Sequence, residues 1–476
     1  MTLLKPYDKK ICDVDITGSL KFSMFNVFIK KENNINILFN TCSSAVARID
    51  DALCAFIDRT EIFCLGQKKI SDDITKSLHL MIDQGFIVNE NFDELEYVKH
   101  FIFQPQNPDH TYIVIAPTTF CNMQCPYCFE SGFIDCAHMD RQKQEQVVDF
   151  VKSNYSDKNI SVVWYGGEPL LNIKAIEYIS TELIEFTNGQ STNYNAGMIT
   201  NGYLLTPNIS DRLKSLHVRL LQVTLDGFQV SHDKRRKLKT GDATFWRIIN
   251  NLDYAQDLFN ISLRLNVDSR NIKGVQEILE WIRTHRKQWF IGKNKIVPYV
   301  APITCVHRDM DYEYALDRCE FSNIFREFYM DYFFESFKTA LLEESEEYFF
   351  NQYCALERKA WRGVFPFSLT DSCGVLNENL IVIGAEGNLY KCWDTVGVEK
   401  HSIGSITNGI LKNERYQTWQ NYFLPQKCEQ CVYLPICLGG CIRECIDKNG
   451  EPSCPYDFSL YKEVVYKYIN QINTDN

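Results

Sequence analysis

At residues 112–128 the chain reads Tyr-Ile-Val-Ile-Ala-Pro-Thr-Thr-Phe-Cys-Asn-Met-Gln-Cys-Pro-Tyr-Cys. The apolar run 112–116 predicts a buried β-strand, and Cys121, Cys125 and Cys128 follow it within one loop. Folds of the α/β class place their chemistry at the C-terminal ends of their strands. Three close thiolates suit an iron–sulfur cube, which takes four ligands, so that one iron stays open for a group that is not protein. A zinc site or buried structural cysteines are the alternatives.

The composition is that of a globular protein with two or three domains. The chain has 476 residues, of which 45% are hydrophobic and 23% are charged. Its net charge of -11 argues against a nucleic-acid partner. The N-terminus lacks a signal core and no apolar run is long enough for a membrane span, so we expect a cytoplasmic protein with no membrane partner. In that reducing compartment, the 19 cysteines are expected to bind metal rather than to form disulfides.

The region around the cysteine loop, residues 106–305, is predicted to form an α/β core. Short apolar strands alternate with amphipathic helices, which favours a parallel sheet of six βα units, either open or barrel-like. The strands are predicted at 112–116, 161–165, 197–200, 220–225, 263–267 and 296–300, and helices between them at 142–155, 173–186 and 275–284.

Three further regions flank the core. Residues 1–105 are predicted to form a small mixed module, and residues 306–372 an aromatic, helical bridge. Residues 373–476 are rich in cysteine and predict a domain that depends on its metal ligands for its fold. Within the first module we predict a hairpin of strands 25–29 and 35–39, helices over 44–57 and 73–84, and a short strand at 86–88.

The spacing Cys-x3-Cys-x2-Cys, with the aromatic Tyr127 before the last cysteine, resembles the signature of radical S-adenosylmethionine (SAM) enzymes. This resemblance implies a partial (β/α)6 barrel and a [4Fe-4S] cluster held by Cys121, Cys125 and Cys128. The open iron of that cluster binds the amino and carboxylate groups of SAM. One electron from the reduced cluster then cleaves SAM to a 5′-deoxyadenosyl radical, which abstracts hydrogen from an unactivated carbon.

Other short motifs follow in the order typical of that family. The resemblance implies that Gly166 and Gly167 permit close backbone approach and that Glu168 pairs with the amino group of SAM. It also implies cofactor contacts for Asn201 and Asp226, and it places Arg236 against the SAM carboxylate. A plain turn at Gly166–Pro169 and a solvated basic loop around Arg236 are the structural alternatives.

The C-terminal cysteines give a stronger signal, because chance produces Cys428-x2-Cys431-x5-Cys437-x3-Cys441 in about one such chain in a thousand. With Cys373, Cys392 and Cys454, the pattern resembles the SPASM domain, which carries two auxiliary [4Fe-4S] clusters, so that three clusters are implied in all. Zinc knuckles are the alternative. By position, the second auxiliary cluster takes Cys428, Cys431, Cys437 and Cys454, and the first takes Cys373, Cys392 and Cys441, with Cys354 as the best candidate for its fourth ligand and Cys445 as the next.

Together these regions resemble the maturases of ribosomally made peptides (RiPPs). The resemblance implies a winged-helix-like first module that captures the leader of a precursor peptide, for which β-augmentation of an edge strand would serve. It further implies a thioether or carbon–carbon crosslink as product and reduced flavodoxin or ferredoxin as electron donor. The motifs identify no catalytic residue.

Two alternative functions stay open. One is an anaerobic sulfatase maturase, which forms formylglycine; in that family an Asp directly follows the counterpart of Cys392, where this chain has Trp393 and then Asp394. The other is a non-catalytic iron–sulfur or zinc protein that binds a peptide.

Overall fold

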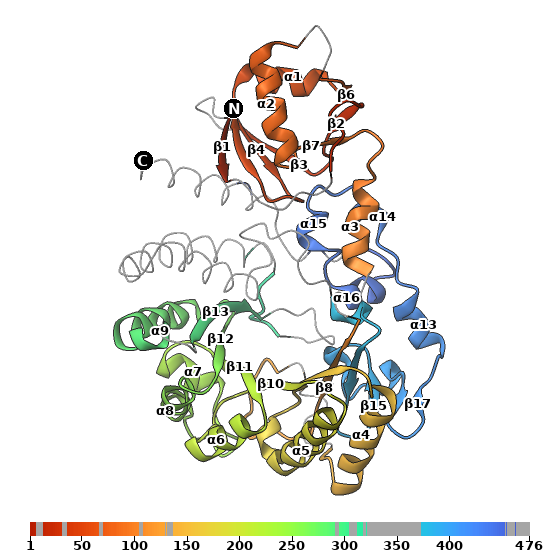
Figure 1. Ribbon diagram of the computed structural model, residues 1–476. Helices are drawn as coiled ribbons and strands as arrows, with labels where there is room; N and C mark the ends of the chain where they lie inside the picture. Colours follow the sequence, from red (N-terminus) through yellow and green to blue (C-terminus); the bar gives the residue numbers. More distant parts are fainter. Residues whose placement is uncertain are drawn as a thin grey trace. The chain divides into compact units, whose positions relative to one another are not determined.

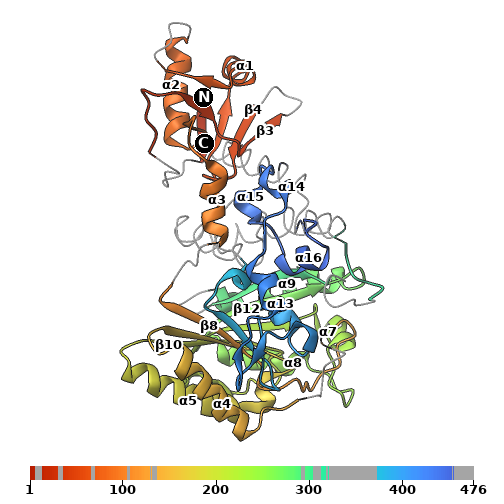
Figure 2. The same cartoon turned by 90° about the vertical axis from the view of Figure 1, so that its right-hand side faces the viewer.

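The computed structural model describes residues 1–5, 13–30, 36–65, 70–103, 108–128, 130, 137–290, 295–303, 312–317, 320, 373–452, 454 and 462 (Figures 1 and 2). The chain forms two compact units. The first comprises residues 1–106, 350–373 and 423–476, and the second comprises residues 107–349 and 374–422. The cysteine-rich region predicted at 373–476 is therefore divided between the two units.

The second unit is built on a ten-stranded sheet with the order β13-β12-β11-β10-β9-β8-β14-β15-β16-β17. From β13 to β14 all neighbouring strands are parallel, and the last three pairs are antiparallel. The strands are β8 (His110–Ile115), β9 (Asn159–Trp164), β10 (Tyr194–Thr200), β11 (Val218–Leu225), β12 (Asn260–Val267), β13 (Ile296–Pro302), β14 (Leu380–Ile383), β15 (Asn388–Tyr390), β16 (Gly404–Ser405) and β17 (Gly409–Ile410). The six predicted strands, in their parallel arrangement, are confirmed.

Amphipathic helices follow these strands and cover one face of the curved sheet (Figure 1). Side chains cap the starts of two of these helices: the Asp140 carboxylate accepts a hydrogen bond from the Lys143 N–H, and the Thr206 hydroxyl accepts one from the Ile209 N–H. The helices are α4 (Arg141–Asn154), α5 (Ile173–Gly189), α6 (Pro207–Ser215), α7 (Gln229–Arg235), α8 (Phe245–Ala255) and α9 (Ile272–His285). Those predicted at 142–155, 173–186 and 275–284 are confirmed as α4, α5 and α9.

The first unit contains two small antiparallel sheets, with strand orders β1-β5-β4-β3 and β6-β2-β7. The predicted hairpin is confirmed as β3 and β4, whose register pairs Phe28 with Leu38. Its elements up to residue 103 are β1 (Thr2–Lys5), β2 (Leu20–Phe22), β3 (Asn26–Lys30), β4 (Asn36–Asn40), β5 (Val46–Ile49), α1 (Asp51–Arg59), β6 (Ile62–Phe63), α2 (Asp72–Asp83), β7 (Ile87–Asn89) and α3 (Glu94–Phe103).

The helix predicted over 44–57 is wrong in its first part. Residues 46–49 form β5, which pairs with β1 and β4, and the helix starts only after Asp50, whose carboxylate accepts a hydrogen bond from the Leu53 N–H. A short apolar run is compatible with the period of a helix or of a strand, and pairing with β1 and β4 makes these residues a strand. The helix predicted at 73–84 and the strand at 86–88 are confirmed as α2 and β7.

The C-terminal segment of the first unit shares a core with its N-terminal sheet. One face of β3, β4 and β5 packs against Tyr433 and Ile436. The Thr41 hydroxyl donates a hydrogen bond to the carbonyl oxygen of Val432, and Lys99 Nζ lies 2.8 Å from Glu429 Oε1. This segment contains the short helices α14 (Gln426–Glu429), α15 (Leu434–Cys437) and α16 (Ile442–Asp447).

Most of the bridge predicted at 306–372 lies outside the described residues, and so does the predicted ligand Cys354. Among the residues that are described, none of the helices has the length and apolar character needed to cross a membrane.

Candidate functional site

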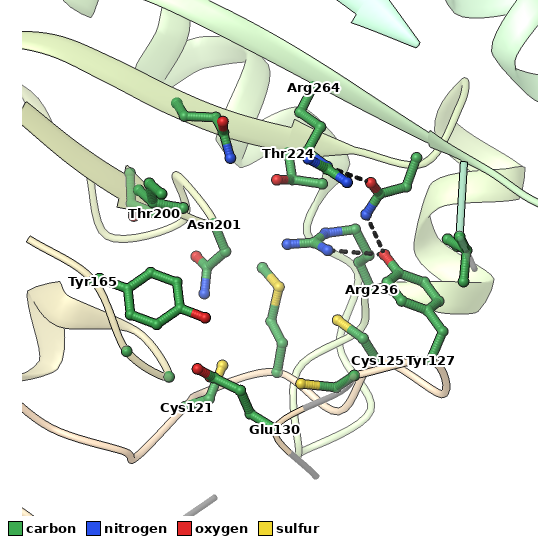
Figure 3. A pocket seen from close by; sticks show the side chains of 18 of the residues that line it. Cys121, Cys125, Tyr127, Glu130, Tyr165, Thr200, Asn201, Thr224, Arg236 and Arg264 are labelled. Carbon is green, nitrogen blue, oxygen red and sulfur yellow. Dashed lines mark hydrogen bonds between the residues drawn. The ribbon is translucent and has the colours of Figure 1, made fainter. Parts of the chain in front are cut away.

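A cavity of about 390 Å3 opens at the C-terminal ends of the parallel strands (Figure 3). Thr200, Thr224 and Asn266 reach it from β10, β11 and β12, so the cysteine loop lies where α/β folds carry their chemistry. Its lining residues are Cys121, Met123, Cys125, Tyr127, Cys128, Glu130, Tyr165, Gly166, Gly167, Ile199, Thr200, Asn201, Gln222, Thr224, Arg236, Arg264, Asn266, Pro302, Ile303, Trp393 and Asp394.

The three thiols of the cysteine loop share this cavity. Burial raises the pKa of Cys121 to about 11 and that of Cys128 to about 12, and it also raises the pKa of Cys125. The Arg236 guanidinium opposes this effect at Cys121 and Cys125, and it thereby favours the thiolate, which is the form that binds metal. Such a donor set fits an iron–sulfur cube.

Among the described residues no group of three or more His, Cys, Asp or Glu is placed to hold a single metal ion. The cysteine ligands of a cube do not need to converge on one point, because each of them binds a different iron.

The two glycines after β9 are required by the cysteine loop itself. Gly166 has φ +112°, and a Cβ there would lie 2.4 Å from the carbonyl oxygen of Thr118. A Cβ on Gly167 would lie 2.4 Å from the carbonyl oxygen of Thr119. Both contacts are impossible for a larger residue, so these glycines let the turn pack against the backbone that leads into Cys121.

Glu168 is fully buried and holds two loops together. Its carboxylate accepts hydrogen bonds from the Leu170 N–H at 3.1 Å, the Thr200 hydroxyl at 2.8 Å and the Asn201 N–H at 2.8 Å. Asn201 in turn donates to Asn122 Oδ1 in the cysteine loop at 2.8 Å. Glu168 is not among the described residues that line the cavity, so its predicted contact with SAM stays a prediction.

Tyr127 and Asp226 position Arg236 within a buried charged network. The Tyr127 hydroxyl donates to Asp226 Oδ1 at 2.7 Å and accepts from Arg236 Nη1 at 2.9 Å. Arg235 donates to Asp226 at 2.9 Å and to Asp268 at 2.5 Å. The network therefore pairs two arginines with two aspartates, which is the condition under which buried charges are stable.

Arg236 lines the cavity together with Tyr127, whereas Arg235, Asp226 and Asp268 are not among the lining residues. The Nε atom of Arg236 is buried and has no hydrogen-bond partner among the described residues, and Figure 3 shows its guanidinium reaching into the open space. The guanidinium gives the cavity a positive charge, which would favour an anionic ligand there. Asp226, by contrast, is buried beneath the lining, and its part in binding is to hold Tyr127 and Arg235.

Sequence reasoning missed several lining residues, of which Tyr165 and Trp393 are the clearest. Their rings stack with centroids 6.4 Å apart and planes inclined by 29°, and Trp393 stays 46% exposed. Trp393 and Asp394 reach the cavity because β14 pairs with β8, which brings residues from the far end of the chain to this site. The only signal in the sequence was their position directly after Cys392.

The C-terminal cysteines are distributed over both units. Burial, with smaller contributions from the thiols of Cys428, Cys454 and Cys431, raises the pKa of Cys437 to about 12, so these four predicted ligands lie near one another. Burial likewise raises the pKa of Cys441, with a smaller contribution from Cys373 in the same unit. Cys392 belongs to the second unit and Cys354 is not described, so both auxiliary clusters stay predictions.

Comparisons with known proteins agree with this geometry. The family model of the Radical SAM superfamily matches residues 115–282, which contain the cysteine loop, Glu168 and Arg236. The serine-type anaerobic sulfatase-maturating enzyme of Bacteroides thetaiotaomicron is 21% identical over 404 residues, which are 76% of this chain and 89% of that protein. The radical SAM cyclopropyl synthase TigE of Paramaledivibacter caminithermalis is 23% identical over 233 residues, which are 43% of this chain and 48% of that protein.

Several of the curated relatives are matched over only about half of their length, with 44% and 58% covered in two uncharacterized proteins. Among solved structures, native anSMEcpe with bound AdoMet has a TM-score of 0.54 and 18% identity, and the match covers 77% of this chain and 100% of that one. This likeness shows a shared fold. Residues 115–282 therefore match the Radical SAM superfamily, and the chain as a whole resembles the maturases of that superfamily.

Proposed function

We propose that this protein is a peptide maturase that cleaves SAM to a 5′-deoxyadenosyl radical and installs a thioether or carbon–carbon crosslink in a ribosomally made precursor peptide. The observation that carries the proposal is one cavity shared by three thiols, by a buried guanidinium whose Nε has no hydrogen-bond partner among the described residues, and by an exposed aromatic side chain. Its volume of about 390 Å3 lies in the range of cofactor sites.

Some residues of the cavity would bind the cofactor, and others would contact the substrate. Cys121, Cys125 and Cys128 would hold the cluster, which together with SAM supplies the one-electron reduction and the carbon radical. Arg236, which lines the cavity, would offer its guanidinium to the carboxylate of SAM, and the buried Tyr127 keeps that guanidinium in place. Trp393, stacked on Tyr165, offers an apolar surface for a substrate side chain and excludes water from the radical.

The share of this chain that known structures cover supports the hypothesis that a leader peptide guides the enzyme. The solved sulfatase-type fold leaves 23% of this chain without a counterpart, since it covers 77% of it. The first unit offers four edge strands, β1, β3, β6 and β7, to which an extended peptide can add. We therefore propose residues 1–105 as the module that captures the leader and the SPASM-like region as the carrier of the auxiliary clusters.

A sulfatase maturase is the second candidate. The match to 89% of the serine-type enzyme favours it, and Asp394 lines the cavity one residue after Trp393. A non-catalytic peptide-binding protein is disfavoured, because such a protein has no use for three thiols beside a buried guanidinium whose Nε is unsatisfied among the described residues.

The test uses anaerobically reconstituted enzyme, SAM, dithionite and the short peptide encoded beside its gene. We expect 5′-deoxyadenosine together with a peptide that has lost two hydrogen atoms for each crosslink, detected by mass spectrometry. The crosslinked peptide should not react with a hydrazide probe, because no aldehyde is formed. Conversion of a Cys or Ser in a sulfatase-derived peptide to a hydrazide-reactive product would instead identify the second candidate.

The cofactor site gives a further prediction. Replacing Arg236 with Ala or Glu168 with Gln should weaken SAM binding about tenfold or more, since each charge-assisted hydrogen bond contributes about 1.5 to 3 kcal/mol. Arg236→Ala removes the donor in the cavity, whereas Glu168→Gln loosens the Thr200–Asn201 loop. Isothermal titration calorimetry with SAM measures both effects.

The matched control is Arg247→Ala, which removes an exposed arginine from α8 in the same unit. Its SAM affinity should equal that of the wild type. Wild-type affinity in Arg236→Ala would show that the free Nε–H is not used for the cofactor.

A further inference from the structure

A second arginine, Arg264 on β12, lines the cavity. Its Nε donates a hydrogen bond to Asn266 Oδ1 at 2.7 Å, and its guanidinium carbon lies 6.0 Å from the centre of the Tyr299 ring. The side chain is half-buried, and among the described residues its guanidinium makes no other hydrogen bond and no ion pair. Its two Nη groups are therefore available to a ligand in the cavity.

Arg264 and Arg236 are the two ends of one chain of hydrogen bonds (Figure 3). Asn266, which accepts from Arg264, donates through Nδ2 to the Tyr127 hydroxyl at 3.3 Å. Arg236 Nη1 donates to the same hydroxyl at 2.9 Å. All four side chains line the cavity, so the chain fixes the distance between its two cationic groups. Anions bound to the two arginines would be held at a fixed separation.

The two arginines lie at different depths along the sheet. Arg264 is in register with Thr224 on β11, whereas Asn266, two residues later, is the residue of β12 that reaches Tyr127 in the cysteine loop. Two residues of a strand span about 7 Å, so the backbone of Arg264 lies that much farther from the C-terminal end of β12 than the backbone of Asn266. Arg236 contacts the cysteine loop directly. Arg236 thus serves a ligand at the loop, and Arg264 is left for a second ligand deeper in the cavity.

Two carboxylates, Glu130 and Asp394, also line the cavity. Figure 3 shows Glu130 beside Cys121, on the opposite side of the view from Arg264. Burial, followed by the charge of Glu130, raises the pKa of Cys128 to about 12, which places Glu130 close to the cysteine loop. Both carboxylates have interactions of their own. In the part of the chain that the structure describes, neither of them forms an ion pair with Arg264.

The groups around Arg264 are neutral and can donate hydrogen bonds. The Tyr299 hydroxyl donates to Gln222 Oε1 at 2.9 Å, which leaves the amide N–H groups of Gln222 for a ligand. The Thr224 hydroxyl lies on the neighbouring strand at the level of Arg264. A guanidinium with both Nη groups open matches the two oxygens of a carboxylate. In an unmodified ribosomal peptide at neutral pH, carboxylates belong to Asp, to Glu or to the C-terminus.

We propose that Arg264 binds a carboxylate of the precursor peptide and thereby determines which peptide residue faces the cofactor. This inference rests on the proposed function and names its substrate class, a core peptide with an acidic group beside the residue that is modified. The hydrogen-bonded chain through Asn266 and Tyr127 would hold that carboxylate at a set distance from the carboxylate of SAM at Arg236. Arg264 is a positioning and specificity residue, and no bond is formed or broken at it.

The test combines a change in the enzyme with a change in the peptide. The enzyme variant is Arg264→Gln, and the matched control is Arg219→Gln, which removes an exposed arginine of β11 that does not line the cavity. The probe is the core part of the precursor encoded beside the gene. It is prepared unchanged, with each Asp or Glu replaced in turn by Asn or Gln, and with a C-terminal amide. Fluorescence anisotropy in the presence of SAM, without reductant, measures binding in the absence of turnover.

We expect Arg264→Gln to bind the unchanged core peptide about tenfold or more weakly than the wild type and the control, because a charge-assisted pair is lost. One of the peptide changes should weaken binding to the wild type by the same factor. That change should cost the Arg264→Gln enzyme nothing further, since its partner is already absent. Loss from an Asn or Gln replacement identifies a side-chain carboxylate, and loss from the amide identifies the C-terminus. Arg264→Lys, which keeps the charge without the fork of donors, should give an intermediate affinity.

A purely structural role for Arg264 would weaken the binding of every peptide alike, so additive losses would overturn the inference. Binding that no carboxylate replacement affects would overturn it as well. The affinity of Arg264→Gln for SAM should stay within about twofold of the wild type, and a tenfold loss would show that the guanidinium serves the cofactor instead. Peptide binding that depends on Arg264, without any crosslinked product from the wild type after dithionite is added, would contradict the proposed function alone.

Discussion

Replacing Cys121, Cys125 and Cys128 together with alanine is expected to abolish the cleavage of SAM to 5′-deoxyadenosine. The three thiols are the only cysteines among the described residues that line the cavity, so no other described thiol there can take their place. Without them the cluster has no ligands, and a SAM molecule bound through Arg236 receives no electron. Anaerobic incubation with dithionite, followed by chromatography of the nucleoside products, measures the effect.

Iron analysis of the same preparation separates loss of this cluster from general damage. Iron should fall from about twelve to about eight atoms per chain, counting four for each cube, because the auxiliary ligands lie elsewhere. A variant with Cys42, Cys54 and Cys64 changed to alanine is the matched control, since these three cysteines of the first unit are not predicted ligands. Its iron content and cleavage rate should stay unchanged, and cleavage that survives in the first variant would refute the cluster assignment.

The parallel core could be predicted from the sequence because its signals are local. Each strand is a short apolar run followed by a turn and an amphipathic helix, as β12 and α9 show. The strands β14 to β17 escaped prediction, since β14 joins the sheet by pairing with β8, almost 270 residues earlier in the chain. The same kind of distant pairing turned residues 46–49 into β5 rather than helix.

In the candidate site, too, the residues with local sequence signals could be predicted and the others could not. Cys121 and Arg236 each belong to a short motif within one stretch of the sequence. The spacing within these motifs was enough to identify both as candidate site residues. The side chains of Glu168 and Asp226 support the lining rather than form it, because their hydrogen bonds are made to Asn201, Tyr127 and neighbours that only the folded chain assembles. No spacing rule distinguishes a residue that lines a cavity from one buried beneath it.

Deletion of residues 1–100 should separate a leader-guided maturase from the sulfatase-type alternative. Basal SAM cleavage should persist, because every lining residue of the cavity lies at position 121 or later. Binding of the full precursor should be lost and turnover of its core should fall about a hundredfold, since a tether commonly raises effective concentration by that factor or more. Leader binding by fluorescence anisotropy and product formation by mass spectrometry are measured on one preparation.

The deletion also removes the strands that cover Tyr433 and Ile436, which lie next to predicted auxiliary ligands. The iron content of the truncated enzyme must therefore be measured as well. A gentler variant avoids this loss of packing. Among the described edge strands of the first unit β3 is the longest. The Thr41 N–H donates to the carbonyl oxygen of Phe25, so the N–H groups of residues 27 and 29 point toward β4 and those of residues 28 and 30 point away from it.

Lys30→Pro removes one outward N–H from this edge, and Lys30→Ala removes the same charge but keeps the N–H. If the leader adds as a strand at β3, the proline variant should bind the precursor about tenfold or more weakly than the alanine variant, because one main-chain hydrogen bond is lost and the ring obstructs the added strand. Both variants should keep all their iron. Equal binding by the two would exclude this edge, and a truncated enzyme that processes the precursor as well as the intact one would exclude leader guidance altogether.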